Sequence, residues 1–292
     1  MTSARAQVGI IGGSGLYEME GFTDAREVKV DTPFGAPSDA ITIGTLSGVR
    51  VAFLPRHGIG HIHTPSTVPY RANIYALKKL GIKFVIAVNA CGSLREDYAP
   101  GHIVIPDQIF DYTTGLRDRT FFGEGLVAHI SVADPYCAEL SAIVGEAVEN
   151  VGGTVHRGGT FLIEEGPRFA TRAESNIFRQ WGCSIIGMTT CPEAFLAREA
   201  EMCYATMAHV TDYDVWHQSE EPVTVDMVVA TFRRNIEIAQ NAIARAVEML
   251  DADTACECHD ALQTAIMSEK HAVPLAVVKR LNPIVGRYFP QE

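Results

Sequence analysis

The segment from Ser184 to Trp216 constrains the fold more than any other part of the chain. It begins with a short uncharged apolar run, Ser184 to Met188, which is typical of a buried strand. The capping-box spacing of Thr190 and Glu193 then predicts a helix of about ten residues, and Cys203 to Val210 predicts a second strand. A helix of this length is near the minimum for a crossover between parallel strands. The segment therefore predicts a βαβ unit.

Polar side chains follow both strands of this predicted unit. Thr189 comes after the first strand, and an Asp-x-Asp pair, Asp212 and Asp214, comes after the second. Because the carboxyl ends of parallel strands meet at one edge of a sheet, and α/β proteins bind ligands there, we expect these groups to lie close together.

Two strands in the N-terminal part of the chain end in turns that suit an anion. The strand that begins at Val8 runs into a Gly-Gly-Ser-Gly turn containing Ser14, and the strand Val49–Pro55 is followed by Arg56 and His57. The first turn lacks the third glycine of a dinucleotide-binding fingerprint, so its N–H groups and hydroxyl predict a small anion instead. Arginine is well shaped for bidentate contact with phosphate. A plain surface turn is the alternative at both places.

Two later strands end in a similar way. Lys83 to Ala90 is the most apolar strand and leads into Cys91-Gly92-Ser93, and Gly159 to Glu165 leads into Gly166-Pro167-Arg168-Phe169. In a largely parallel sheet these ends can share one edge with the turns described above. The sequence therefore predicts a phosphate site beside a site for a polar ring.

Composition and charge exclude several classes of function. The 292 residues are 47% hydrophobic and 20% charged, which is typical of a soluble globular protein. The formal net charge of −11 argues against a nucleic-acid binder, which needs a basic face. No apolar run reaches the ~18 residues of a membrane span, and glycines shorten the N-terminal apolar run below signal-peptide length. We therefore expect a cytoplasmic protein with no nucleic-acid or membrane partner.

The cysteines do not form a secreted disulfide framework, because the seven of them are scattered and odd in number. Cys256-Glu257-Cys258-His259 is the exception. A Cys-x-Cys pair beside a histidine could be half of a metal site, but no second pair stands at the spacing of a zinc finger, so we expect no metal. A local or inter-segment disulfide is favoured, and reduced thiols are the alternative.

Taken together, these stretches resemble the 5'-methylthioadenosine phosphorylases, a family within the trimeric purine nucleoside phosphorylases. The matching stretches run in the family's order from Val8 to about Leu250: GIIGGSGL, RHG, NACGSLRE, EGPRF with TRAES, IIGMTT with PEAFLAREA, and TDYDVW. The resemblance implies one α/β domain over residues 1–292, with a central mixed, largely parallel twisted sheet flanked by helices. A C-terminal extension over about 252–292 would pack on the core.

The resemblance also implies a reaction, the phosphorolysis of 5'-methylthioadenosine to adenine and 5-methylthioribose 1-phosphate. This is a pentosyltransferase activity of purine and methionine salvage, with inorganic phosphate as co-substrate and no metal or other cofactor. The implied assembly is a homotrimer, or a homohexamer of paired trimers. Family members from hot environments use Cys-x-Cys disulfides, which implies a Cys256–Cys258 bridge and a second bridge between Cys137 and Cys203.

The resemblance assigns site residues by position. Residues at or after the ends of the predicted strands would hold phosphate: Ser14, Arg56, His57, Asn89, Ala90 and Thr189. Residues from later segments would contact the nucleoside: Phe169, Ala170, Met188, Asp212, Asp214, Val225, Val228, and His129 from a neighbouring subunit. Among these, Phe169 would stack near the purine, Met188 would lie against the ribose, and Val225 and Val228 would line the methylthio pocket.

The two aspartates explain the implied chemistry. Repulsion between carboxylates raises one pKa, which would help Asp212 act as the proton donor at the purine N7. An ionised Asp214 accepts a hydrogen bond from a 6-amino group and repels a 6-oxo group. The chain departs from the family at Ala170, where many members have Ser, and at Asn89, where others have Thr. The alternatives are a 6-oxopurine nucleoside or methylthioinosine phosphorylase, and a non-catalytic nucleotide-binding protein.

Overall fold

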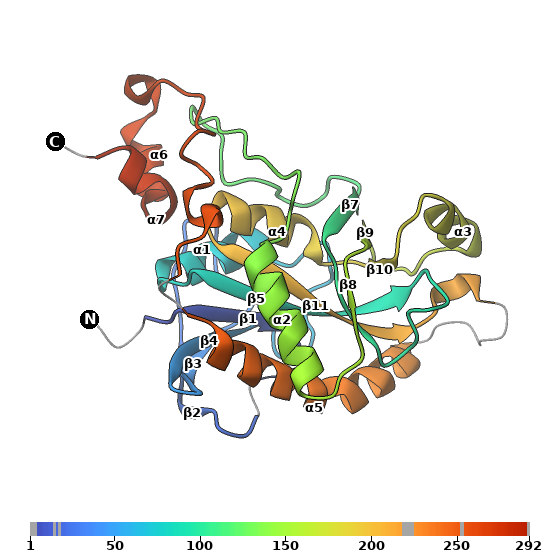
Figure 1. The fold of residues 1–292 in the computed structure, drawn as a ribbon. Helices are drawn as coiled ribbons and strands as arrows, with labels where there is room; N and C mark the ends of the chain where they lie inside the picture. The colour runs from blue at the N-terminus through green and yellow to red at the C-terminus, as the bar shows by residue number, and fades with distance from the viewer. Residues whose placement is uncertain (1–4, 14–15, 17–18, 218–224, 252–253, 291–292) are drawn as a thin grey trace.

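Strand β5 (Phe84–Ser93) lies at the centre of the structure (Figure 1). The computed structural model describes residues 5–13, 16, 19–217, 225–251 and 254–290, with only the backbone of 226–235. β5 pairs in parallel with β1 (Val8–Gly12) and β11 (Cys203–Asp212), and β1 pairs in parallel with β4 (Val49–Pro55). These four strands carry half of the predicted site residues in or beyond their carboxyl-terminal parts.

The strands form one mixed, mostly parallel sheet with the order β2-β3-β4-β1-β5-β10-β9-β7, in which β11 joins β5 to β6 and β6 pairs with β8. The remaining strands are β2 (Thr23–Val28), β3 (Ile41–Leu46), β6 (Ile103–Ile105), β7 (Gln108–Tyr112), β8 (Val155–Arg157), β9 (Thr160–Glu164) and β10 (Ile185–Gly187). The expected fold class is confirmed.

Helices cover both faces of this sheet. The α-helices are α1 (Tyr70–Lys79), α2 (Ala138–Asn150), α3 (Arg172–Gln180), α4 (Thr190–Glu199), α5 (Val225–Met249), α6 (Leu275–Arg280) and α7 (Asn282–Val285). The short 3₁₀ helices are η1 (Asp214–Trp216), η2 (Glu257–Asp260), η3 (Lys270–Ala272) and η4 (Gly286–Tyr288). Figure 1 shows α2 and α5 on one face of the sheet and α1 with α4 on the other. No helix in the described ranges is long and apolar enough to span a bilayer.

The alternation of buried side chains along β5 builds two cores. Val85 and Ala87 belong to the core under α1 and α4, whereas Phe84, Ile86 and Val88 belong to the core under α2 and α5. Successive strand residues point to opposite faces, so a strand buried on both faces reads as a continuous apolar run. This is why β5 is the most apolar strand in the sequence.

The C-terminal segment, residues 254–290, packs on the core beneath α1 and α4. Leu281 and Ile284 are buried in the same cluster as Leu77 of α1. The Tyr75 hydroxyl donates to the carbonyl of Arg280 at 2.8 Å. Apolar burial and this hydrogen bond therefore hold the segment against α1.

Two details of the central segment differ from the sequence prediction. β10 and β11 do not form a parallel βαβ unit, because β10 pairs antiparallel with the last residues of β5 and β11 pairs parallel with β5. In addition, β5 continues through Cys91, Gly92 and Ser93, where a turn was expected. Pairing with Ile185 and Ile186 of β10 keeps this small-residue stretch extended.

The expected disulfides are not formed. All seven cysteines are free thiols, including the Cys256 and Cys258 pair and the Cys137 and Cys203 pair. Instead, the sulfur atoms of these four residues lie within 4.8 Å of one another.

Candidate active site

A buried ion pair joins Arg56 at the end of β4 to Glu193 in α4. The Arg56 Nε and Nη2 atoms donate to the two carboxylate oxygens of Glu193, both at 2.8 Å. Arg56 Nη1 donates to the carbonyl of Val88 at 2.9 Å, and the Tyr204 hydroxyl donates to Glu193 at 2.8 Å. The guanidinium is thereby fixed beside the end of β5. Its remaining N–H groups are free in these contacts to meet an anion.

Glu193 was interpreted as half of a capping box with Thr190, and this interpretation is wrong. Helix α4 is capped at Thr189, whose side chain makes no capping hydrogen bond, and the Glu193 side chain turns to Arg56 instead. Cys191 has non-helical backbone angles, so the regular helix begins after it. Burial explains the difference. An unpaired buried carboxylate costs more free energy than a missing helix cap, so the Glu193 side chain pairs with the Arg56 guanidinium.

Asn89 and Thr189, which the family resemblance assigns to phosphate, lie side by side because of the antiparallel course of β10. The Asn89 amide Nδ2 donates to the Thr189 hydroxyl at 2.9 Å, and both side chains are buried. The Asn89 Oδ1 atom is buried without a hydrogen-bond partner. Ala90, the next residue along β5, is exposed. A polar, incompletely satisfied corner thus lies at the start of α4, and a helix N-terminus favours an anion.

His57 follows Arg56 but is not a cation at neutral pH. Its Nδ1 lies 2.8 Å from the carbonyl of His63, so Nδ1 carries the proton and Nε2 is an acceptor. Burial lowers the pKa of His57 to about 4, and the neighbouring Arg56 charge acts in the same direction. In this arrangement the ring offers an acceptor to a protonated phosphate oxygen.

Asp212 and Asp214 form a short turn at the end of β11. The Asp214 backbone N–H donates to Asp212 Oδ1 at 2.7 Å, and the Thr211 hydroxyl donates to Asp212 Oδ2 at 2.7 Å. Asp214 has a left-handed φ of 52°, which aspartate tolerates when its neighbours make local hydrogen bonds. Both carboxyls are buried, and Asp214 Oδ2 has no hydrogen-bond partner.

A third carboxyl, Glu164 at the end of β9, adds to this pair. Burial and the charge of Asp214 raise the pKa of Glu164 to about 8, and burial and Asp212 raise the pKa of Asp214 to about 6. Burial also raises the pKa of Asp212, against the two hydrogen bonds that it accepts. Glu164 therefore holds a proton near neutral pH, and the upward shift at Asp212 favours its protonated form, as proton donation requires.

Arg117 holds the segments around the site together, and no sequence motif indicates this role. Its Nη1 donates to the carbonyls of Met188 at 2.6 Å and Cys191 at 2.5 Å. Its Nη2 donates to the carbonyl of Glu165 at 2.6 Å, and its Nε donates to the Glu165 carboxylate at 3.0 Å. Arg117 comes from an irregular loop without periodicity, so only the tertiary structure reveals its partners.

Gly92 of β5 allows the carboxylate turn to approach the sheet closely. A Cβ atom at this position would lie 3.0 Å from Asp212 Oδ1 and 3.2 Å from the Asp214 Cβ. Asn89 lies three residues earlier in the same strand, which corresponds to roughly 10 Å along an extended chain. The anion corner and the carboxylate cluster therefore border the same strand about one nucleoside length apart.

The other predicted residues lie at several places around this strand. Phe169 is partly exposed and Ala170 is buried on the segment between β9 and α3, and Met188 is half-buried. The exposed His129 donates its backbone N–H to Ala265 of the C-terminal segment, whose helices α6 and α7 lie at the opposite end of the molecule from α3 (Figure 1). Val225 is exposed at the start of α5. Ser14 and the Val228 side chain lie outside the described residues.

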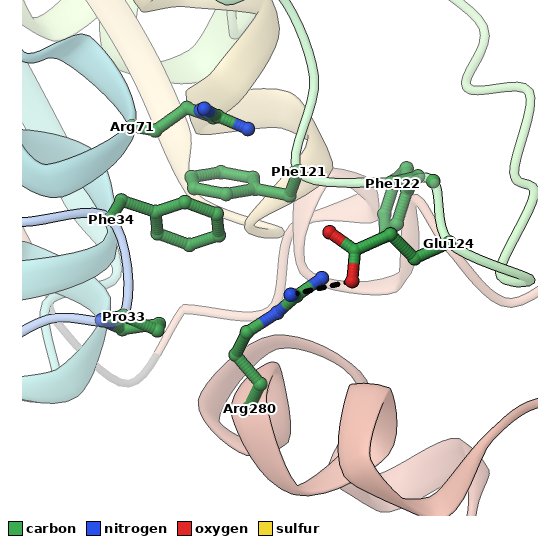
Figure 2. A pocket seen from close by; sticks show the side chains of 8 residues that line it. Pro33, Phe34, Arg71, Phe121, Phe122, Glu124 and Arg280 are labelled. Carbon is green, nitrogen blue, oxygen red and sulfur yellow. Dashed lines mark hydrogen bonds and ion pairs between the residues drawn. The ribbon is translucent and has the colours of Figure 1, made fainter.

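A separate hollow of about 350 Å³ lies outside this site. Figure 2 shows Phe34, Phe121 and Arg71 along one side of it and the Arg280–Glu124 ion pair, 2.8 Å long, on the other. None of the predicted site residues lines it. The hollow therefore adds nothing to the anion corner or to the carboxylate cluster.

The fold is α/β with a mixed sheet, and one strand of that sheet borders both the anion corner and the carboxylate cluster. We expect this arrangement in an enzyme that joins phosphate to a sugar. The chain belongs to the phosphorylase superfamily, whose family model matches residues 7–248. The family resemblance seen in the sequence is thereby confirmed.

Individual relatives narrow this class. The chain is 54% identical to the S-methyl-5'-thioadenosine phosphorylase of Geobacter sulfurreducens, over 96% of this chain and 98% of that protein. It is also 54% identical to the enzyme of the same name from Chloroflexus aurantiacus, over 97% and 99% of the two chains. A methylthioadenosine phosphorylase from an antarctic soil metagenomic library has a similar solved structure, with a TM-score of 0.92, 47% identity, and 96% and 99% coverage. A methylthioadenosine phosphorylase from Schistosoma mansoni in complex with adenine has a TM-score of 0.83, 37% identity, and 90% and 99% coverage.

Proposed function

We propose that the protein catalyses the phosphorolysis of 5'-methylthioadenosine to adenine and 5-methylthioribose 1-phosphate. The protein is an enzyme of the pentosyltransferase class, as its family and its similarity to named relatives support. The observation that carries the proposal is the placement of Asn89 and Gly92 on one strand, with an anion corner at the first and carboxylates at the second. Phosphate and purine would occupy these ends, with the ribose between them.

At the anion end, Arg56, Asn89 and Thr189 would hold phosphate. The Arg56–Glu193 pair fixes the guanidinium without cancelling its remaining N–H donors. The Asn89 amide can rotate so that Oδ1 accepts from the Thr189 hydroxyl and the NH₂ group faces the anion. Ser14, the Ala90 backbone and His57 would complete the phosphate contacts.

At the base end, Asp214 supports recognition of a 6-aminopurine. Its buried Oδ2 lacks a partner, and a pKa of about 6 leaves the carboxyl mostly ionised at neutral pH. An exocyclic amine donates a hydrogen bond to this oxygen, whereas a 6-oxo group would add a second acceptor beside it. Phe169 would lie near the purine beside Ala170, Met188 near the ribose, and Val225 and Val228 near the methylthio group.

The reaction breaks the bond between the ribose C1' and the purine N9 while a phosphate oxygen bonds to C1'. The electron pair of the broken bond passes to the purine, and a proton delivered at N7 neutralises it. Asp212 would supply that proton, because burial raises its pKa while Asp214 N–H and Thr211 hold its orientation. These residues supply all the groups that the reaction needs, so we propose that it uses no metal or other cofactor.

We also propose a setting for this activity. Residues 1–292 would form one nucleoside phosphorylase domain, with about 252–292 as an extension on its core. The enzyme would work in the cytoplasm, in purine and methionine salvage, as a homotrimer or as a homohexamer of two trimers. His129 would reach the site of a neighbouring subunit, which its exposure and its position on a loop tied to the C-terminal segment support.

A substrate panel with and without phosphate tests the function directly. Methylthioadenosine, adenosine, methylthioinosine and inosine would be incubated with the purified protein, and free base and sugar phosphate would be quantified by chromatography. We expect phosphate-dependent release of adenine, with methylthioadenosine as the best substrate. Equal release without phosphate would indicate a hydrolase, a preference for inosine would overturn the role of Asp214, and no turnover at all would favour a binding protein.

Asp212 variants test the proposed proton donor. We expect Asp212→Ala to lower kcat/KM on the order of 10²- to 10⁴-fold, the range for a lost general acid. The kcat/KM of Asp212→Asn should lie between the values for the wild-type protein and for Asp212→Ala, because the asparagine amide can still donate a hydrogen bond to N7. The exposed Asp134→Asn is the matched control and should leave turnover unchanged. Near-normal turnover of Asp212→Ala would contradict the assignment.

A further inference from the structure

Four buried thiols from three separate segments meet at the end of the sheet remote from the carboxylates. Cys137 precedes α2, Cys203 begins β11, and Cys256 and Cys258 lie in the C-terminal segment. Their sulfur atoms lie within 4.8 Å of one another, and the Sγ atoms of Cys137 and Cys256 are 3.7 Å apart. Sulfur ligands at ~2.3 Å from a tetrahedral Zn²⁺ are about 3.8 Å from each other. The cluster therefore has the dimensions of a tetrathiolate metal site.

Local backbone structure explains why the thiols converge. Cys256 has extended backbone angles, with φ −136° and ψ 142°, and Cys258 lies in the 3₁₀ helix η2 that follows it directly. Cys137 is the N-cap residue of α2, and the Leu140 backbone N–H donates to its Sγ at 3.4 Å. A helix N-terminus and an N–H donor both stabilise a thiolate over a thiol.

Positive charge lies where thiolates would form. Arg198 Nη1 is 3.0 Å from the Cys258 Sγ. An unpaired charge in this buried environment would be costly, so the guanidinium favours a negatively charged sulfur beside it. A metal cation would supply the missing countercharge for the other three.

The remaining polar neighbours are compatible with a metal. His259 Nε2 lies 3.5 Å from the Cys203 Sγ and can donate to a thiolate there. Glu139 Oε2 lies 3.4 Å from the Cys137 Sγ and accepts its thiol proton in the metal-free state. Glu139 is exposed, so its carboxylate can turn into solvent when that proton is lost.

We propose that Cys137, Cys203, Cys256 and Cys258 form a structural Zn²⁺ site. Four thiolates close the coordination sphere, which leaves no position for chemistry and is the usual form of a structural zinc. Binding displaces the thiol protons to solvent and involves no redox change. The ion ties the C-terminal segment to α2 and β11. Cys203 and Asp212 stand at opposite ends of β11, roughly 30 Å apart, so the site is separate from the reaction centre.

This proposal replaces the sequence-based preference for a disulfide and the expectation of no metal. No second pair of cysteines stands at zinc-finger spacing, but the fold supplies the two further ligands singly, from distant segments. Disulfides within the cluster are the rival outcome, and the two states differ in metal content and in mass.

Metal analysis of the purified full-length protein tests the site. Protein prepared without chelators and under reducing conditions should contain about one zinc ion per chain by elemental analysis. Cys203→Ser and Cys258→Ser should lose most of that zinc, while Cys183→Ala, a buried cysteine outside the cluster, should keep it. Circular dichroism would check that each variant is folded. Wild-type protein loaded with Co²⁺ gives a readout that needs no variant, because tetrahedral thiolate ligation produces intense visible absorption and sulfur-to-metal charge-transfer bands.

Three results would overturn the site. The first is wild-type protein that neither contains zinc nor develops the cobalt bands when reduced. The second is a non-reduced mass lower by two hydrogens for each disulfide, with no metal bound. The third is zinc retained in both serine variants at the wild-type level. None of these results depends on turnover, so each is distinguishable from failure of the proposed catalytic function.

Discussion

Asp214 keeps one buried carboxylate oxygen without a hydrogen-bond partner, and we propose that this oxygen contacts the 6-position of the purine. Asp214→Asn would place an amide there that can donate to a 6-oxo group. We expect the ratio of kcat/KM for methylthioinosine to that for methylthioadenosine to rise by about tenfold or more, since an unpaired buried polar group costs on the order of 1–3 kcal/mol. Side-by-side kinetics would measure this ratio. An unchanged ratio would mean that Asp214 does not contact the 6-position.

The pKa of Asp214 predicts that the preference between 6-amino and 6-oxo purines depends on pH. Burial and Asp212 raise the pKa of Asp214 to about 6, so the group is ionised above that pH and protonated below it. A protonated Asp214 can donate to a 6-oxo group, so the preference for the 6-aminopurine should weaken as the pH falls through about 6. Kinetics with both substrates from pH 5 to 8 would reveal the shift, and Asp214→Asn should abolish it.

The Arg56–Glu193 pair allows a prediction about stability. Because both side chains are almost completely buried, Glu193→Ala leaves an unpaired buried guanidinium and should destabilise the protein by roughly 3–5 kcal/mol. The matched control is Glu149→Ala, which breaks a 3.0 Å surface pair with Arg157 and should cost about 1 kcal/mol or less. Chemical denaturation of the variants measures both values. Similar costs for the two variants would show that the buried pair contributes no more than a surface pair.

Residues that follow strands were predictable from the sequence, and residues that act through tertiary contacts were not. Asp212 and Asp214 stand beside each other in a motif, and Arg56 directly follows an apolar strand. Glu193, by contrast, has the spacing of a helix cap, and only burial assigns it to Arg56. Glu164 is the last residue of an apolar strand, and a carboxylate at that position indicates only that the strand ends there. Its proximity to Asp214 depends on the sheet order.

Among the secondary-structure elements, the direction of β10 determines how the anion corner and the carboxylate cluster are placed relative to each other. The sequence predicted a parallel crossover, because a short helix between two apolar strands is the signature of one. The structure instead runs β10 antiparallel to β5, which brings Thr189 to Asn89 while Asp212 pairs opposite Gly92. Strand order and direction depend on contacts far apart in sequence, so no local pattern specified them.

A substitution at Gly92 tests whether the close packing of the carboxylate turn on β5 is required for activity. A methyl group in Gly92→Ala would lie 3.0 Å from Asp212 Oδ1, and we expect it to displace the carboxylate turn and lower kcat/KM by about tenfold or more. Gly9→Ala is a matched control in β1, since the atoms nearest to its Cβ would be side-chain atoms of Ile82 and Leu77. That variant should lower the thermal stability and leave the turnover of folded protein intact. Equal losses of turnover in both variants would argue against a specific effect at Asp212.

At the scale of the whole molecule, buried carboxyls with raised pKa values predict lower stability in alkaline solution. The pKa of Glu164 rises to about 8 and that of Glu199 to about 7 through burial, above the ordinary value of 4.5. The folded state therefore holds protons that the unfolded chain releases, so this stabilisation is complete below about pH 4.5 and is lost as the pH rises through 7 to 8. Glu164→Gln should flatten the fall in Tm between pH 6 and 9 by removing up to a few kcal/mol of pH dependence. The exposed Glu146→Gln should leave the pH profile unchanged.

His129 is proposed to serve the site of a neighbouring subunit, so a mixture of two variants can test whether neighbouring subunits share a site. Asp212→Ala and His129→Ala should each be poorly active alone. If the two variants are mixed under conditions that exchange subunits, some sites will combine the intact Asp212 of one subunit with the intact His129 of the other. We therefore expect activity to recover to a fraction of the wild-type value, and sedimentation should show trimers or hexamers. A fully active His129→Ala variant, an active monomer, or a mixture without any recovery would each show that the site is complete within one chain.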